Sequence, residues 1–338
     1  MKVGIIGVGH VGAACAKAML LRGSCHEIVL LDLDEQRARG VANDLSHGEL
    51  LCPPTCIRTG GDEDLSGAAV VVITAGINEQ AGKAIDRGDR RGRLLLLPHN
   101  AGVYREIVPR IAAVAPEVPI LVVTDPPDPL ADVARQLTTT NPVFSSGTFL
   151  DTLRFRLQIA RKLGQSPSPL EAPVAGVEVK ETRARPGWCH PSSVEALVIG
   201  EHGTSQVYVW SSARIGGTPV LELAAREGWN VAAFRTEVET AVRYANIDII
   251  EGTGASQHGI GIVTARIIEA MLRDEGLVAP IGTLQPEFKV TLSLPAVIGH
   301  GGVSKVLTPT LSAEETEALA ASAAAIKKAL ADLAPSST

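Results

Sequence analysis

KVGIIGVGHVG, residues 2–12, decides how the first half of this chain folds. A short apolar run, typical of a buried strand, leads through Gly7, Gly9 and Gly12 into a helical pattern. Glycines at this spacing permit a tight turn and let backbone N–H groups at a helix N-terminus approach a pyrophosphate. The stretch therefore predicts a strand, a dinucleotide-binding turn and a helix.

The second apolar run ends in an acidic residue. Residues 27–32 read EIVLLD, which places Asp32 at the end of a predicted strand, about 20 residues after Gly12. A carboxylate there can accept hydrogen bonds from the ribose hydroxyls of an adenosine, and it repels the 2′-phosphate of NADP. The pattern predicts a preference for NAD, with Asp34 as the alternative carboxylate.

Short β-rich runs alternate with helical patterns through the first half of the chain. Apolar residues at helical spacing predict a crossover helix between 100 and 115. This alternation is typical of a parallel sheet covered by helices. We expect an α/β fold, with an N-terminal doubly wound (Rossmann) parallel sheet in residues 1–147 and a C-terminal α+β substrate domain in residues 148–334. The further strands are predicted at 69–74, 119–124 and 142–146.

The second half has a different pattern. FLDTLRFRLQIARKL, residues 149–163, predicts a long helix, and the proline-rich, charged segment 165–189 predicts a surface excursion. Ser312 and Glu315 have the spacing of a capping box at the start of the last helix. Helices are predicted at 259–272 and 312–330, with the strand sequence VTLSLPAVIG at 290–299 between them.

Composition and charge exclude several classes of function. The net charge is -6 and the sequence holds no basic block, which argues against a nucleic-acid partner. No apolar run reaches the length of a membrane span, so we expect no membrane partner and a cytoplasmic location. Among the five cysteines only Cys52 and Cys56 have a spacing that suits a metal, and they would need two further ligands; we expect free thiols and no metal.

Two segments of the second half carry groups suited to the reduction of a 2-oxo acid. GEHG places His202 on a glycine-flanked turn after an apolar strand, and the helix at 149–163 places Asp151 and Arg154 on one face. This chemistry needs a cation for the carboxylate, a donor that polarises the carbonyl and an acid that supplies a proton. The residues alone leave the alternatives of a structural histidine and a surface ion pair open.

Six segments occur along the chain in the order IIGVGHVG, DLSHG at 44–48, TAG at 74–76, FLDTLRFR, GEHG and VTLSLPAVIG. In this order they resemble the lactate/malate dehydrogenase family. The resemblance runs nearly from end to end of the chain and implies reversible hydride transfer between NAD and a small 2-hydroxy acid. L-lactate and pyruvate come first, and malate or a longer-chain L-2-hydroxy acid second; a homodimer or homotetramer is also implied.

The resemblance also implies roles for individual residues. His202 would donate the proton in 2-oxo acid reduction and accept it in 2-hydroxy acid oxidation, and Asp151 would orient its imidazole. Arg154 would hold the substrate carboxylate in a bidentate fork. Arg93, seven residues before Asn100, would polarise the carbonyl from a mobile loop.

Further binding residues follow from the same resemblance. Ser256 would offer a hydroxyl on the substrate side, although serine is also a common helix N-cap. The remaining cofactor contacts would come from His10 and Val11 in the glycine turn and from Thr74, Ala75, Gly76, Asn100, Val123 and Asp125.

Three features depart from the family pattern. Asp125 stands where the family has an asparagine, and an ionised carboxylate cannot donate a hydrogen bond; it is protonated, or turns away, or the substrate is different. The loop 77–92, which carries the specificity residue, is longer than in the lactate and malate enzymes. Gln80 near its start favours a monocarboxylate, whereas Arg87 has a spacing that suits a dicarboxylate. The third departure is the inserted segment 165–189.

Two other classes of function remain as alternatives. An NAD-binding sensor without turnover is suggested by Asp125 and the altered loop, whereas the presence of His202, Asp151 and Arg154 argues against it. An NAD- and metal-dependent glycosidase would need a Cys/His metal pair, which GEHG does not provide.

Overall fold

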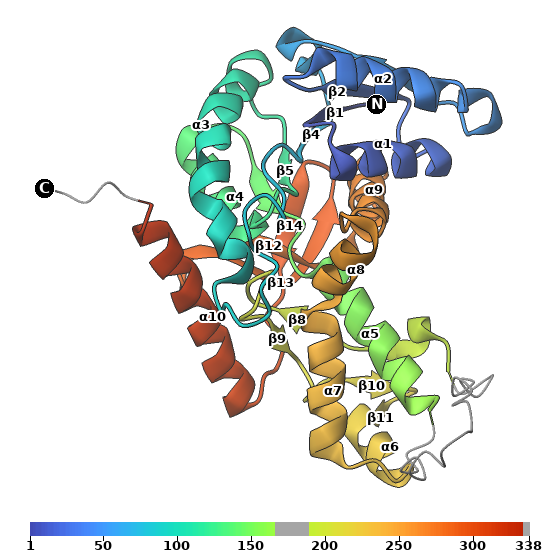
Figure 1. Ribbon diagram of the computed structural model, residues 1–338, viewed down its shortest axis with the longest axis vertical. Coiled ribbons are helices and arrows are strands. Elements are labelled where there is room, and N and C mark those ends of the chain that lie inside the picture. The colour runs from blue at the N-terminus through green and yellow to red at the C-terminus, as the bar shows by residue number, and fades with distance from the viewer. Residues whose placement is uncertain (166–188, 334–338) are drawn as a thin grey trace, which may run out of the picture.

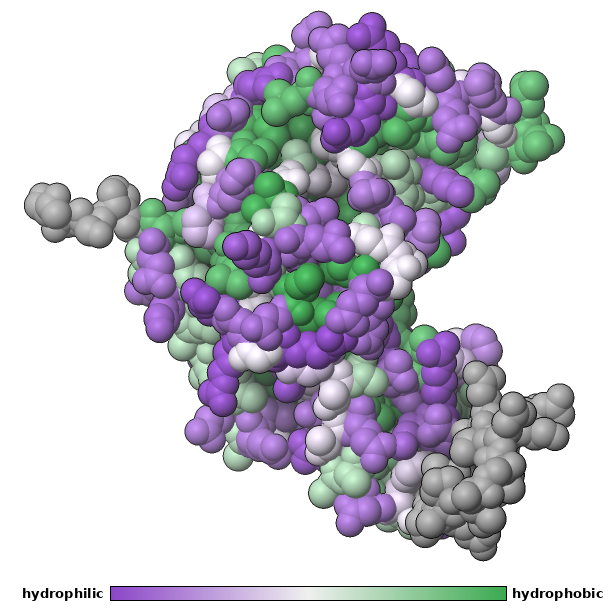
Figure 2. Space-filling view, in the orientation of Figure 1, coloured by the Kyte–Doolittle hydropathy of each residue, from purple (hydrophilic) through white to green (hydrophobic). Residues whose placement is uncertain are grey.

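The computed structural model describes residues 1–165 and 189–333 (Figure 1). The predicted surface excursion at 165–189 therefore lies almost wholly outside the described residues. Purple hydrophilic residues are spread over the face shown in Figure 2, with the green hydrophobic residues in separate groups between them. None of the helices in the described part of the chain is long and apolar enough to cross a membrane.

A nine-stranded sheet forms the centre of the fold, in the order β14-β13-β12-β6-β5-β4-β1-β2-β3. The six strands from β3 to β6 are parallel, and β12, β13 and β14 add to the β6 edge in antiparallel orientation. The strands are β1 (Lys2–Ile6), β2 (Glu27–Leu31), β3 (Cys56–Thr59), β4 (Val70–Ile73), β5 (Ile120–Val122), β6 (Val143–Ser145), β12 (Leu277–Gln285), β13 (Val290–Gly299) and β14 (Gly302–Val306).

The parallel part has the strand order 3-2-1-4-5-6 of a doubly wound fold, so the predicted N-terminal architecture is confirmed. β3 is a strand that the sequence analysis did not predict. Only one of its four residues is buried, so the stretch lacks the apolar run that marked the other strands.

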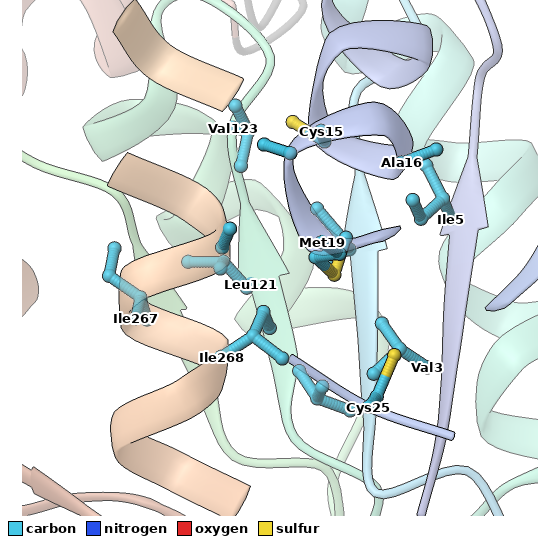
Figure 3. Close-up of a cluster of buried hydrophobic side chains, with 14 of the residues drawn as sticks. Val3, Ile5, Cys15, Ala16, Met19, Cys25, Leu121, Val123, Ile267 and Ile268 are labelled. Carbon is cyan, nitrogen blue, oxygen red and sulfur yellow. The ribbon is translucent and has the colours of Figure 1, made fainter. Parts of the chain in front are cut away.

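Helices cover both faces of this sheet because alternate strand residues point to opposite sides. On one side α1 and α9 pack against β1, β4 and β5; Figure 3 shows Met19 and Ile268 of these helices beside Val3 and Leu121 of the strands. On the other side α3 and α4 pack against the intervening strand residues, such as Val71. The helices that pack around the parallel part of the sheet are α1 (His10–Arg22), α2 (Glu35–Ser46), α3 (Leu97–Val114), α4 (Pro127–Leu137) and α9 (His258–Leu272).

The lower part of the molecule in Figure 1 has its own core beneath α5. Phe155 of α5 packs edge-on against Trp210 with 4.7 Å between ring centroids, and Phe234 of α7 lies on the far side of that tryptophan. The C-terminal α+β prediction is thus confirmed. The remaining helices of the chain's second half are α5 (Phe149–Leu163), α6 (Val220–Arg226), α7 (Val231–Arg243), α8 (Ala245–Thr253) and α10 (Ala313–Ala331). The short strands are β7 (Val194–Glu195), β8 (Val198–Ile199), β9 (Val207–Tyr208), β10 (Arg214–Ile215) and β11 (Thr218–Pro219).

Candidate active site

A cleft of about 750 Å³ lies at the carboxyl ends of β1, β4 and β5. The order of strand addition reverses between β1 and β4, and ligands of doubly wound folds bind at such a switch point. The far wall comes from α5, the turn of His202 and the start of α9. The predicted site residues that line the cleft are Gly9, His10, Val11, Thr74, Gly76, Arg93, Val123, Asp125, Arg154, His202 and Ser256.

The glycine turn between β1 and α1 has the shape that a pyrophosphate requires. Gly7 has a φ of +94°, in the region that favours glycine, and a Cβ on Gly12 would lie 2.0 Å from the carbonyl oxygen of Gly7. A Cβ on Gly9 would meet no atom within 4 Å, so this side of the turn is open to the cleft. Gly7 and Gly12 shape the turn from behind, whereas Gly9 faces the space that a dinucleotide needs.

Asp32 at the end of β2 contacts the same turn. Its Oδ2 accepts a hydrogen bond from the backbone N–H of Val8 at 2.6 Å, and its Oδ1 accepts one from the N–H of Asp34 at 2.9 Å. Asp34 instead caps α2 by accepting from the N–H of Arg37 at 3.0 Å. Of the two carboxylates that the sequence offered, Asp32 is therefore the one beside the glycine turn, although it does not line the cleft itself.

Two polar side chains hold together the loops after β1, β4 and β5. Thr74 donates its hydroxyl to the carbonyl of Gly7 at 2.5 Å. Asn100, fully buried on α3, accepts from the N–H of Ile77 at 2.8 Å and donates to the carbonyl of Asp125 at 2.7 Å. Asn100 and Ala75 do not line the cleft, and Asn100 acts on it by fixing the backbone of the loops that do.

His202, Asp151 and Arg154 form a connected cluster at the far wall. Nδ1 of His202 lies 2.5 Å from Oδ2 of Asp151, and Arg154 donates to the other carboxylate oxygen at 3.0 Å. Burial alone would lower the pKa of His202, but the charge and hydrogen bond of Asp151, together with the charge of Asp125, raise that pKa above its ordinary value. Burial alone would raise the pKa of Asp151, but His202 and Arg154 lower it overall. Asp151 thus favours the charged form of the imidazole, and Nε2 lies on the side of the ring away from this carboxylate, in a residue that lines the cleft.

The backbone at His202 is fixed by a carboxylate that sequence reasoning missed. Oδ2 of Asp128, fully buried at the start of α4, accepts from the N–H of His202 at 2.7 Å, and its Oδ1 accepts from the hydroxyl of Ser145 at 2.6 Å. Burial raises the pKa of Asp128 to about 7. The only signal in the sequence was an acidic residue inside a helix that the sheet buries.

Arg93 already lies in the site. It belongs to the short 3₁₀ helix Gly92–Leu96 and only 8% of it is exposed. Its Nε lies 3.1 Å from Oδ2 of Asp125 and 3.9 Å from Oε1 of Glu79. Within the described residues this Nε has no hydrogen-bond acceptor, so both contacts are ion pairs without a hydrogen bond from Nε.

Asp125 points into the site. Besides its contact with Arg93, its Oδ1 lies 3.6 Å from Nε2 of His202. The alternative in which this side chain turns away is therefore wrong. The carboxylate of Asp125 therefore faces both Arg93 and Nε2 of His202, the two groups expected to polarise and protonate a carbonyl.

The loop 77–92 presents different residues from those expected. Gln80 is exposed outside the cleft. Arg87 also lies outside it, where the guanidinium binds Asp248 and Glu251 of α8 at 2.6 and 2.7 Å. Neither side chain can contact a substrate in this structure, whereas Glu79, which the sequence analysis did not single out, lines the cleft.

The residues still to be placed are Ser256 and the cysteine pair Cys52 and Cys56. Ser256 lies just before α9, with its hydroxyl 3.4 Å from the guanidinium of Arg154. Cys52 and Cys56 are free thiols, and no group of three or more His, Cys, Asp or Glu in residues 1–165 and 189–333 could hold a metal ion.

Comparisons with known proteins agree with this geometry. A model described as lactate/malate dehydrogenase, NAD binding domain, matches residues 1–144, and one described as lactate/malate dehydrogenase, alpha/beta C-terminal domain, matches residues 183–335. The protein named L-lactate dehydrogenase in Deinococcus radiodurans is 39% identical over 329 residues, which are 97% of each chain. Its counterpart in Thermus aquaticus is 39% identical over 336 residues, covering 97% of this chain and 98% of that protein.

Solved structures extend the similarity to three dimensions. The crystal structure of a lactate dehydrogenase enzyme from a Medee basin deep-sea metagenome library matches with a TM-score of 0.83 and 31% identity over 98% of both chains. The minor L-lactate dehydrogenase from Enterococcus mundtii, in a ligands-bound form, matches with the same TM-score and 28% identity over 98% of both chains.

Proposed function

Because the chain belongs to the lactate/malate dehydrogenase family, we propose that it catalyses reversible hydride transfer between NAD and a small 2-hydroxy acid. L-lactate and pyruvate are the first pair to test, since the relatives are named L-lactate dehydrogenases. The observation that carries the proposal is the buried His202–Asp151–Arg154 cluster facing a cleft with a glycine turn at its other end.

The residues at the glycine turn fit a dinucleotide. The open face at Gly9 would take the pyrophosphate, and Asp32 beside Val8 would take the adenosine ribose. When bound, NADH supplies the hydride. The carboxylate of Asp32 supports a preference for NAD over NADP because it would repel a 2′-phosphate.

His202 would move the proton. Asp151 occupies Nδ1, so the proton that reaches the substrate comes from Nε2, and the same atom accepts it in the reverse direction. Against the effect of burial, Asp151 raises the pKa of His202, which favours the protonated imidazole that 2-oxo acid reduction requires. Asp151 stabilises the cation and fixes the ring, as an orienting carboxylate does in other proton-transfer sites.

The two arginines would bind and polarise the substrate. One amino group of Arg154 donates to Asp151, and the other donates to the hydroxyl of Ser256 at 3.4 Å, so the guanidinium and this hydroxyl would bind the substrate carboxylate together. Arg93 would stabilise the oxygen that becomes negative during reduction, and burial makes its charge more effective there than in water. These assignments place carboxylate, carbonyl and proton donor along one wall of the cleft.

Steady-state oxidation of NADH with pyruvate, oxaloacetate, 2-oxobutyrate and 2-oxoisocaproate tests the proposal. We expect turnover that Arg161→Lys, an exposed change on the outer face of α5, leaves intact and that His202→Asn reduces by about 10²-fold or more. Absence of turnover with every 2-oxo acid, in a protein that still binds NADH, would support the sensor alternative instead.

We further propose a homodimer or homotetramer that works in the cytoplasm. Leu50 and Leu51 are adjacent and 96% and 94% exposed, which supports a contact between copies near η1 (Glu49–Leu51). The free thiols support a reducing compartment. Light scattering after size-exclusion chromatography measures the oligomeric state, and a monomer at micromolar concentration would contradict this proposal.

A further inference from the structure

We propose that the pocket selects substrates with a positively charged side chain, and that Glu79, assisted by Asp125, recognises an ammonium group on the 2-hydroxy or 2-oxo acid. This inference rests on the proposed function, because it names the substrate class of the same site. It follows from the position of two carboxylates that hydride transfer does not require.

Glu79 is a largely buried acid whose negative charge is only weakly stabilised by its neighbours. It lies at the start of the loop 77–92 and lines the cleft, with 13% of its side chain exposed. The nearest cation in the described part of the chain is Arg93, at 3.9 Å, which is too far for a hydrogen bond. Burial and the carboxylate of Asp125 both raise the pKa of Glu79 above its ordinary value. The charge of Arg93 acts in the opposite direction but does not offset these two effects.

Asp125 competes with Glu79 for the same cation. It lies closer to Arg93, at 3.1 Å, so a single guanidinium faces two carboxylates. Arg93 must also face the substrate carbonyl if it is to polarise it, and it then neutralises each acid less well. Two largely buried carboxylates thus share one guanidinium, and a positive charge on the ligand would stabilise both of them.

A count of the charges joined by ion pairs around Arg93 and His202 points to the same conclusion. With His202 protonated, the cations Arg93, Arg154 and His202 balance the carboxylates Glu79, Asp125 and Asp151. The carboxylate of a bound 2-oxo acid then leaves the site with one excess negative charge. An ammonium group on the substrate side chain restores neutrality. Hydride and proton transfer move charge inside the site without changing its total, so the count also applies to the 2-hydroxy acid.

The same count argues against a dicarboxylate substrate. A second carboxylate would bring the excess to two negative charges beside Glu79. The residue that could have met it, Arg87, is bound to α8 outside the cleft. We therefore expect kcat/KM to be highest for an ammonium-bearing substrate, lower for a neutral one and lowest for a dicarboxylate.

A pair of substrates of equal shape tests the charge alone. L-2-hydroxy-4-aminobutanoate and L-2-hydroxypentanoate differ by an ammonium group in place of a methyl group. We expect kcat/KM for oxidation with NAD to be at least about tenfold higher for the amino compound, the lower limit for a close pair of opposite charges in a desolvated site. L-malate is expected to have the lowest kcat/KM of the three.

Glu79→Gln separates recognition from a structural role. If Glu79 binds the ammonium group, the variant loses the preference: kcat/KM falls about tenfold for the amino substrate and stays equal or rises for its neutral counterpart. If Glu79 only orders Arg93, both values fall together. Asp89→Asn is the matched control, because it removes a carboxylate from the same loop outside the cleft and should leave the ratio unchanged.

The outcomes distinguish the two proposals. Turnover of both hydroxy acids with equal kcat/KM, or a parallel loss in Glu79→Gln, overturns the charge recognition and leaves the dehydrogenase proposal standing. Absence of turnover with L-lactate and with both test compounds overturns the proposed function itself. Preference for the amino compound that disappears in Glu79→Gln supports the inference.

Discussion

Replacing Asp151 by asparagine should separate the two tasks that we assign to the buried carboxylate beside His202. Nδ1 of His202 and Oδ2 of Asp151 are 2.5 Å apart, and only 2% of the aspartate side chain is exposed. A hydrogen bond to a charged group contributes about 1.5–3 kcal/mol, and the value here should lie toward the upper end because water is excluded. Since about 1.4 kcal/mol corresponds to a factor of ten, kcat/KM for 2-oxo acid reduction should fall about 10- to 150-fold near neutral pH.

The pH dependence gives the sign of the effect. Without the negative charge at position 151, burial and the charge of Arg93 outweigh the remaining charge of Asp125 and lower the pKa of His202. Reduction requires the protonated imidazole, so its rate decreases as pH rises through that pKa, and the decrease should begin at lower pH in Asp151→Asn than in the unchanged protein. Initial rates of NADH oxidation from about pH 5 to about pH 9 would show the displacement.

NADH binding provides the control for this experiment. Asp151 does not line the cleft, so the Kd for NADH, measured by fluorescence, should be unchanged in Asp151→Asn. Superimposable pH profiles with a rate loss below about threefold would refute the role assigned to the pair. A parallel loss of NADH affinity would show instead that the substitution disturbs the whole cleft.

Three further substitutions have definite expected results. Arg154→Lys should raise KM for pyruvate about 10- to 100-fold with a smaller change in kcat, because an ammonium cannot form the bidentate fork; an unchanged KM would contradict this. Gly12→Ala should weaken NADH binding at least about tenfold, since its Cβ would lie 2.0 Å from a carbonyl oxygen, whereas Gly40→Ala, whose Cβ would meet nothing within 4 Å, should not. For Asp128, a folded-state pKa of about 7 against 3.8 means that the folded chain holds its proton more tightly, so the free energy of unfolding should fall as pH rises from about 4 to about 7. Asp128→Asn should remove that fall in urea titrations, and a stability difference independent of pH would contradict it.

The elements with strong local signals were predictable from the sequence. The strand at 2–6 and the helix at 149–163 have the predicted boundaries, because apolar periodicity marks both. The capping box of Ser312 and Glu315 is present in both directions, at 3.2 and 2.8 Å. Such features depend on residues close together in the chain.

What the sequence did not reveal depends on contacts between distant segments. The strand β12 and the antiparallel extension of the sheet were not predicted, because the pairing of Gly282 with Ser145 joins residues far apart in the chain. The acid at Asp128 reaches His202 only through the tertiary fold. A pattern along the chain records which residues are apolar, but it does not record which strands meet.

Glu79, which lines the cleft, was missed for a related reason. Glu79 and Gln80 are neighbours, and only the path of the loop decides which one enters the cleft. Two contacts fix that path: Arg87 of the loop binds Asp248 of α8, and the hydroxyl of Thr204 donates to the carbonyl of Arg90. An insertion changes the register of a loop without a local signal, so resemblance alone could not assign its residues.

The single continuous sheet limits how this enzyme can open. β12 pairs with β6, and Gly200 beside His202 exchanges backbone hydrogen bonds with Ser293 of β13 at 2.9 and 3.0 Å. A hinge between the halves would have to break these bonds in a buried interior, unlike enzymes whose lobes swing about a free linker. Any change in the shape of the cleft is therefore left to segments outside the sheet, and the loop 77–92, which Arg87 joins to α8, is the one that brings Glu79 into the cleft.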